Sequence, residues 1–177
     1  MHWSKFIRTF CFAAIFSAAS FYLFIVLVDP YDSVPFSLPF EREPVSTNQR
    51  FSYPSLARKA EFDSAIIGTS TARLLKPERL NHLTGDNWVN LAMNSATAYE
   101  QMEMLKLFLR HHAYAKRVVI GIDDAWCRPG QEIQKFTFRP FPPWMYDDNR
   151  WNDLLYIFND KSLENSVRLI EYWLGKR

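Results

Sequence analysis

The sequence predicts an α/β fold built on a parallel sheet and preceded by one transmembrane helix. Short runs of β-branched and apolar residues alternate with stretches of helical periodicity, as in repeated βαβ units. Near the N-terminus, Phe10 to Val28 form a run of about nineteen residues without a charge, just long enough to cross a hydrocarbon core of about 30 Å. We expect one domain after this anchor, because a chain of 177 residues leaves room for no second one.

Charges on either side of the apolar run predict its orientation. Lys5 and Arg8 precede it, whereas Asp29 and Asp32 follow it, so the positive-inside tendency places the N-terminus in the cytoplasm. We therefore expect residues 1–28 to be a cytoplasmic tip and single-pass anchor of the cell membrane, with the rest of the chain periplasmic. A cleaved signal peptide is the alternative, although no A-x-A site directly follows the run.

Composition excludes some classes of partner. The chain is 48% hydrophobic and 16% aromatic, and its net charge of +2 is too small to predict binding to nucleic acid. Cys11 lies inside the apolar run and Cys127 far outside it, so we expect two unpaired, buried thiols and no zinc site. No cofactor is predicted.

The chain after the anchor divides by composition. Residues 29–51 are rich in proline and predict an extended stalk, and residues 52–177 predict the α/β domain. Within that domain, short apolar runs predict three buried strands in SAIIGT, NWVNLA and RVVIGID. Ser52 and Pro54 predict the start of one helix, and Pro77 and Gly85 bound a second from Pro77 to Leu83. Further helices are predicted from Ala98 to Ala113, from Trp151 to Phe158 and from Ser162 to Leu174.

The segment 128–150 is too long and irregular for a simple connection. It contains four prolines and the aromatic residues Phe136, Phe138, Phe141 and Trp144. A lid or binding loop is one interpretation, and packing of these aromatic side chains over a core is the other.

Ligand sites in open parallel sheets form at the carboxyl ends of the strands. In this chain those positions carry GTSTA, AMNSA and DDAW. Ser70 in the first of these motifs would lie on a sharp strand-to-helix turn, where a hydroxyl can act as a nucleophile and helix N–H groups can bind an anion. Alternatively, Ser70 or Thr69 only caps the following helix.

Three longer blocks, DSAIIGTSTARLL, VNLAMNSATAYEQ and RVVIGIDDAW, resemble in order and spacing those of membrane-anchored SGNH/GDSL hydrolases, including proteins of alginate O-acetylation. The resemblance extends from about Asp29 to the end of the chain. It implies a three-layer, flavodoxin-like fold of which this chain holds a part. It also implies that Ser70 is the nucleophile and that Ser70, Ser95 and Asn94 supply the oxyanion hole.

Thr69 and Ser95 stand where the family often has an acidic residue and a glycine, and the chain departs from the family pattern at two further places. Asp123 and Asp124 occupy the third block, where the family has Asn-Asp, and a carboxylate there would repel an oxyanion. No histidine follows His112, so the DxxH block is absent, no triad can be written, and the chain looks truncated relative to the family. We expect His111 and His112 to end a helix at the sheet edge opposite the site.

These observations predict an extracytoplasmic, SGNH-like esterase or O-acyltransferase acting on cell-envelope polysaccharide or a similar acyl ester, incomplete as an enzyme in this chain. The alternative is a non-catalytic, membrane-tethered module that binds carbohydrate or an envelope-assembly protein. A metal site is not predicted, because the adjacent carboxylates of Asp123 and Asp124 would point apart.

Overall fold

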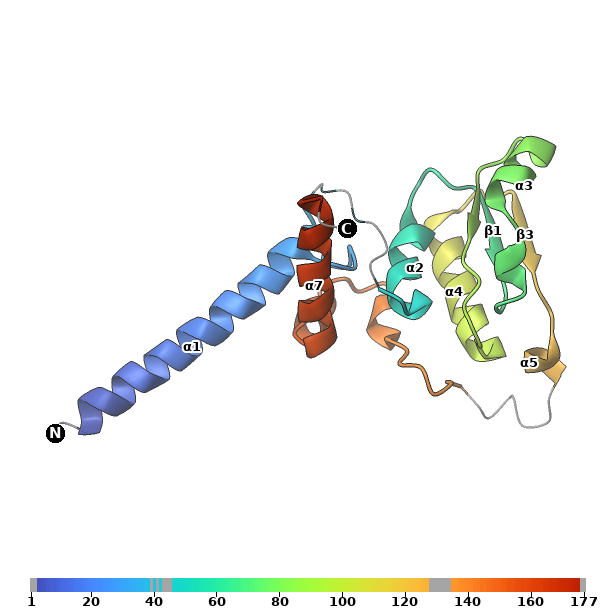
Figure 1. Ribbon diagram of the computed structural model, residues 1–177. Helices are drawn as coiled ribbons and strands as arrows, with labels where there is room; N and C mark the ends of the chain where they lie inside the picture. The colour runs from blue at the N-terminus through green and yellow to red at the C-terminus, as the bar shows by residue number, and fades with distance from the viewer. Residues whose placement is uncertain (1–2, 39, 41, 43–45, 128–134, 176–177) are drawn as a thin grey trace. The chain divides into compact units, whose positions relative to one another are not determined.

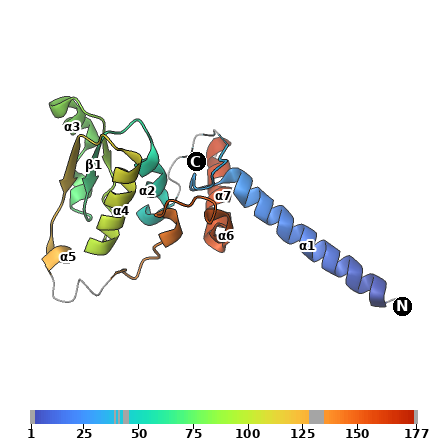
Figure 2. The same cartoon turned by 180° about the vertical axis from the view of Figure 1, so that it is seen from behind.

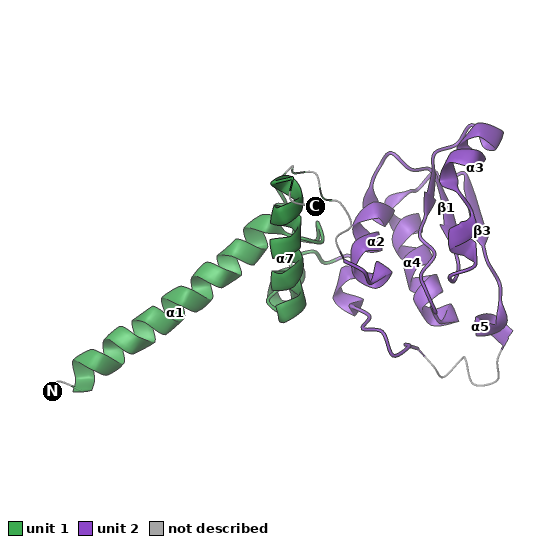
Figure 3. Ribbon diagram, viewed as in Figure 1, with its two compact units in different colours: residues 1–45, 149–177 green, residues 46–148 purple. Residues whose placement is uncertain are grey.

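The computed structural model describes residues 3–38, 40, 42, 46–127 and 135–175. It contains two compact units (Figure 3). Unit 1 is formed by residues 1–45 together with 149–177, and unit 2 by residues 46–148.

Unit 1 is built from both ends of the described chain. Its helices are α1 (Trp3–Val28), the short α6 (Asp153–Tyr156) and α7 (Asp160–Trp173), and α1 packs against α7 near its C-terminal end (Figures 1 and 2). Most of α1 is exposed, and it is long and apolar enough to cross a membrane. The buried apolar core of unit 1 consists of Ile25, Val26, Val28, Tyr31, Val34, Ile157 and Leu169.

A tight turn follows α1 at the start of the predicted stalk, residues 29–51, of which residues 39, 41 and 43–45 lie outside the described part of the chain. The buried carboxylate of Asp29 accepts hydrogen bonds from the backbone N–H groups of Ser33, at 3.0 Å, and Val34, at 3.2 Å. Arg150 donates to the backbone carbonyls of Asp32, Ser33 and Val34 at 2.6–3.1 Å. Burial raises the pKa of the Asp29 carboxyl group despite its N–H donors.

Unit 2 is an α/β unit with a three-stranded, parallel sheet in the order β2-β1-β3. Helix α4 lies against β1, α2 packs on α4, and α3 packs against β2 (Figure 1). The expected α/β fold is thereby confirmed. The elements are α2 (Gln49–Arg58), β1 (Ser64–Ile67), η1 (Ala72–Leu74), α3 (Pro77–Thr84), β2 (Trp88–Asn90), α4 (Ala98–His111), β3 (Arg117–Ile120), α5 (Asp124–Cys127) and η2 (Pro143–Met145).

The strand register places the three carboxyl ends side by side. Ile66 pairs with Asn90, and Ile67 pairs with Ile120. On one face of the sheet, Ile66 packs with Trp88 and with Leu80 of α3. Because all strands are parallel, the turns that follow them meet at one edge of the sheet.

Helix α2 begins about one turn earlier than the sequence predicts. Asn48, not Ser52, caps its N-terminus by accepting a hydrogen bond from the backbone N–H of Arg50, and Pro54 lies inside the helix. Proline has no N–H for the carbonyl four residues earlier. The buried hydroxyl of Tyr146 instead donates to the Arg50 carbonyl at 3.0 Å, which explains how the helix tolerates Pro54.

Strand β3 corrects a second prediction, because it is not buried. Its residues are half-buried or exposed, and Ile122 just beyond it is 72% exposed. The strand lies at the edge of the sheet, and in the described part of the chain no helix covers its outer side chains extensively. The cysteines also differ from expectation, since Cys11 and Cys127 are both exposed.

Candidate functional site

The turn after β1 requires a glycine. A Cβ atom at Gly68 would lie 2.5 Å from the Cβ of Ala72, which is closer than two carbon atoms can approach. The absence of a side chain at Gly68 therefore lets Ala72, the first residue of η1, lie close to the end of β1. Ser70, at the tip of the turn, is exposed.

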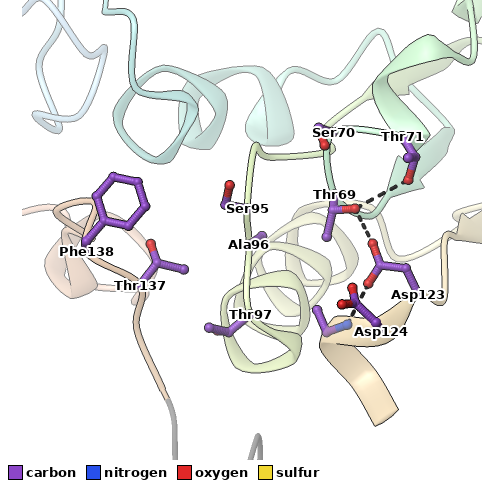
Figure 4. Close-up of a pocket in the computed structure, with 11 residues that line it drawn as sticks. Thr69, Ser70, Thr71, Ser95, Ala96, Thr97, Asp123, Asp124, Thr137 and Phe138 are labelled. Atoms are coloured by element: carbon purple, nitrogen blue, oxygen red, sulfur yellow. Dashed lines mark hydrogen bonds between the residues drawn. The ribbon is translucent and has the colours of Figure 1, made fainter. Parts of the chain in front are cut away.

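Thr69 connects the first and third turns. Its side chain is buried, and its hydroxyl donates a hydrogen bond to the carboxylate of Asp123 (Figure 4). The other carboxylate oxygen of Asp123 accepts the backbone N–H of Ala125 at 3.0 Å, at the start of α5. Asp123 is thus held by a hydroxyl and an amide, and its orientation over the end of the sheet is fixed.

The turn after β2 has an unusual backbone conformation. Ser95 has φ of 54°, in the left-handed region that residues with a side chain adopt rarely. In the described part of the chain, no hydrogen bond uses the backbone N–H of Ser95. This amide therefore remains available as a donor beside the exposed Ser95 side chain.

A buried arginine supports the Ser95 turn. Arg50 is fully buried and donates to both carboxylate oxygens of the equally buried Glu100, at 2.9 and 2.6 Å. It also donates to the carbonyls of Asn94, at 3.2 Å, and Ser95, at 3.5 Å, and to the hydroxyl of Thr137, at 3.3 Å.

Glu100 has a second role as part of a capping box with Thr97 at the start of α4. The Thr97 hydroxyl accepts the backbone N–H of Glu100, and Glu100 accepts the backbone N–H of Thr97, at 3.1 and 3.0 Å. Helix start, ion pair and turn therefore form one connected network. Sequence reasoning missed Arg50, because it lies in the proline-rich segment and its partner is about fifty residues away.

The three turns and residues 137–138 line an open cavity of about 490 Å³, which we call the sheet-end cavity (Figure 4). Six of its lining side chains carry hydroxyl groups, two carry carboxylates, and one is aromatic. The lining residues are Thr69, Ser70, Thr71, Ser95, Ala96, Thr97, Asp123, Asp124, Ala125, Thr137 and Phe138.

The structure brings together most of the sequence-derived site residues. Ser70, Ser95, Asp123 and Asp124 line the sheet-end cavity. Asn94 does not line the cavity. Its side-chain Oδ1 accepts a hydrogen bond from Arg73 at 2.8 Å.

His111 and His112 lie elsewhere in unit 2, as expected. The ring of His112 stacks on Phe108 and is hydrogen-bonded to the carbonyl of Ala57 at 3.0 Å. His111 lines a different cavity with Asp63, which directly precedes β1 and so marks the amino ends of the strands. Burial, Arg58 and Arg110 lower the pKa of His111. No described imidazole lines the sheet-end cavity.

The aromatic side chains of the 135–148 segment divide into two groups. Phe136 packs edge-on to Tyr99 and against Phe141, and Phe141 stacks on Tyr146. These rings are packing elements. Phe138 is different, because it lines the cavity and remains 85% exposed.

Comparisons with known proteins identify no relative. No family model, curated protein or solved structure matches the chain. Among the described residues, no group of three or more His, Cys, Asp and Glu side chains converges in a way that would hold a metal ion. The functional argument therefore rests on the chemistry of the sheet-end cavity.

Proposed function

We propose that this protein is a membrane-anchored module that binds a polyhydroxylated ligand, such as a segment of cell-envelope polysaccharide, in the sheet-end cavity. One observation carries the proposal: the cavity combines hydroxyl groups and carboxylates with an exposed aromatic ring and has no imidazole among its described lining residues. Hydroxyls and carboxylates exchange hydrogen bonds with sugar hydroxyls, and an aromatic face packs against the apolar face of a sugar ring.

The distribution of charge around α1 supports an extracytoplasmic location. Lys5 and Arg8 lie in the first turns of the helix, whereas Asp29 and Asp32 follow its end. Under the positive-inside tendency, α1 spans the membrane with its N-terminus in the cytoplasm, and unit 2 and the part of unit 1 outside α1 lie on the periplasmic side. Envelope polysaccharides are then within reach of the cavity.

Carboxylates in the cavity favour binding over acyl chemistry. In acyl transfer, the cavity must stabilise an oxyanion close to the attacking hydroxyl. Asp123 and Asp124 place two acidic groups among the same lining residues as Ser70. These groups accept hydrogen bonds from sugar hydroxyls but raise the energy of a nearby oxyanion.

Serine acyl chemistry of the SGNH type is the second candidate, favoured by the exposed position of Ser70 on its sharp turn and by the available N–H of Ser95. In this reaction the Ser70 Oγ would attack an acyl carbonyl, the alcohol of the ester would leave, and the acyl group would remain on Ser70. The proton of the Ser70 hydroxyl would need a base, and neither His111 nor His112 lies beside it.

Binding is tested with the full-length, detergent-solubilised protein on an array of envelope oligosaccharides. We expect Phe138→Ala to lose about 1 kcal/mol of binding free energy, a factor of about five in Kd. Tyr114→Ala is the matched control, because Tyr114 is an aromatic residue that is 94% exposed and does not line the sheet-end cavity. Equal effects of the two substitutions, or no oligosaccharide bound by the native chain, would refute the binding proposal.

The two candidates are separated by a fluorophosphonate probe and p-nitrophenyl acetate. The binding proposal predicts that neither reagent reacts at Ser70 in a sample whose fold is verified by circular dichroism. Labelling and turnover that Ser70→Ala abolishes and Ser95→Ala retains in part would instead establish Ser70 as an activated nucleophile.

A further inference from the structure

We propose that the segment 151–158, beside α1 in unit 1, inserts into the outer interface of the membrane as a second contact with lipid. This inference rests on the proposed anchoring by α1. Its occupant is the lipid of that membrane, as the depth of the segment, its exposed apolar side chains and the position of its charges indicate.

Depth follows from the length of the uncharged part of α1. From Thr9 to Val28 the helix carries no charge, and this length, about 30 Å, equals the thickness of a hydrocarbon core. With Arg8 at the inner boundary, the outer boundary lies near Val28. Tyr22 is then about six residues, or about 9 Å, below that boundary.

Two contacts place the segment at the depth of Tyr22. The Tyr22 hydroxyl donates a hydrogen bond to the backbone carbonyl of Leu154 at 3.0 Å, and the Tyr22 ring packs against Phe158 with 5.8 Å between centroids. Interfacial helices bury their apolar face by about 5–10 Å, which matches this depth. The Tyr22 hydroxyl also satisfies a carbonyl that water would not reach there.

The exposed side chains of the segment are those of a membrane interface. Leu155 is 79% and Trp151 is 65% exposed, and Tyr156 and Phe158 are also exposed. Phe36, exposed on the preceding turn, packs against Trp151 with 6.2 Å between ring centroids. Trp and Tyr concentrate at the headgroup level of membranes, and exposed apolar side chains of this density mark an interaction surface.

No charged side chain of the segment 151–158 is exposed. Asp153, the one ionisable acid in the segment 151–158, is fully buried within unit 1. Asp160 and Lys161 follow at the start of α7, beyond the segment. The segment therefore exposes apolar and aromatic groups to the lipid without desolvating a surface charge.

The experiment uses the full-length chain in vesicles of phosphatidylethanolamine and phosphatidylglycerol. With both native cysteines replaced by serine, single variants Leu155→Cys and Trp151→Cys are labelled with an environment-sensitive NBD fluorophore. Quenching is measured with lipids that carry a nitroxide on the acyl chain near the headgroup. Leu83→Cys is the matched control, because Leu83 is an 80% exposed leucine in unit 2.

We expect the labels at 155 and 151 to emit at shorter wavelength and to be quenched several-fold more strongly than the label at 83. Quenching at 155 and 151 no stronger than at 83 would overturn the inference, as would a blue-shifted label without lipid quenching, which indicates contact with protein. A label at Phe16→Cys, near the middle of α1 and measured with lipids that carry the nitroxide deep on the acyl chain, separates the two proposals: strong quenching at 16 without quenching at 155 refutes only the second contact, and no quenching at 16 refutes the anchoring itself.

Discussion

The ion pair between Arg50 and Glu100 provides the sharpest test of how unit 2 is held together. Both side chains are fully buried, so replacing Arg50 by methionine leaves a carboxylate without its cation in a site that water does not reach. Breaking a buried pair in this way costs about 3–5 kcal/mol. The substitution also removes the donors to the carbonyls of Asn94 and Ser95.

We expect Arg50→Met to lower the free energy of unfolding of unit 2 by about 3–5 kcal/mol in urea titrations followed by tryptophan fluorescence. Arg73→Met is the matched control. Arg73 also binds Asn94, but through an exposed contact, so its loss should cost less than about 0.5 kcal/mol.

The double substitution Arg50→Met with Glu100→Met distinguishes stability from the support of the site. Two apolar side chains of similar volume remove the unpaired charge, so part of the lost stability should return, and the loss of the Glu100 acceptor for the Thr97 N–H keeps the recovery incomplete. Carbohydrate binding should not return, because the Ser95 turn still lacks its donors. A cost below about 1 kcal/mol for Arg50→Met, or a double variant no more stable than the single one, would refute this account of the network.

Three further outcomes follow from the structure. Gly68→Ala should lower Tm by several degrees, corresponding to about 1–3 kcal/mol, because its Cβ would lie 2.5 Å from that of Ala72; an unchanged Tm would contradict this. Burial raises the pKa of Asp29 above its ordinary 3.8, so the contribution of Asp29 to stability is present at lower pH and is lost as the pH rises through the raised pKa. Thermal scans at a series of pH values should show the native chain losing stability relative to Asp29→Asn as the pH rises from 3.8 through the raised pKa. Parallel stability curves for the two proteins would contradict the raised pKa. A membrane-impermeant maleimide applied to spheroplasts should label the exposed Cys127 and not Cys11 within α1, and protection of Cys127 until lysis would reverse the proposed orientation.

Local signals in the sequence were sufficient for most elements of unit 2. Pro77 and Gly85 correctly bounded α3, where Gly85 adopts φ of 74°, and apolar periodicity located α4. The start of α2 was misplaced, because Pro54 is a strong local signal that a hydroxyl from Tyr146 overrides. Such long-range hydrogen bonds leave no trace in a local pattern.

Burial and side-chain direction were harder to predict than the elements themselves. Parallel topology was enough to bring Ser70 and Asp123 to the same edge of the sheet. The orientation of Asn94 depends on Arg73, and the exposure of β3 depends on what packs beside it. An all-apolar strand therefore predicts burial only when its covering elements are known, and they were not visible in the sequence.

The composition of unit 1 from two distant segments imposes an order on biogenesis. Unit 2 is an insertion between α1 and the α6–α7 segment. Under the proposed anchoring, α1 enters the membrane before unit 2 is synthesised. Ile25, Val26 and Val28 of α1 cannot be buried in the core of unit 1 until α7 has been synthesised. Under the proposed anchoring, the last step of folding of unit 1 therefore takes place at the membrane surface, after unit 2 has been synthesised.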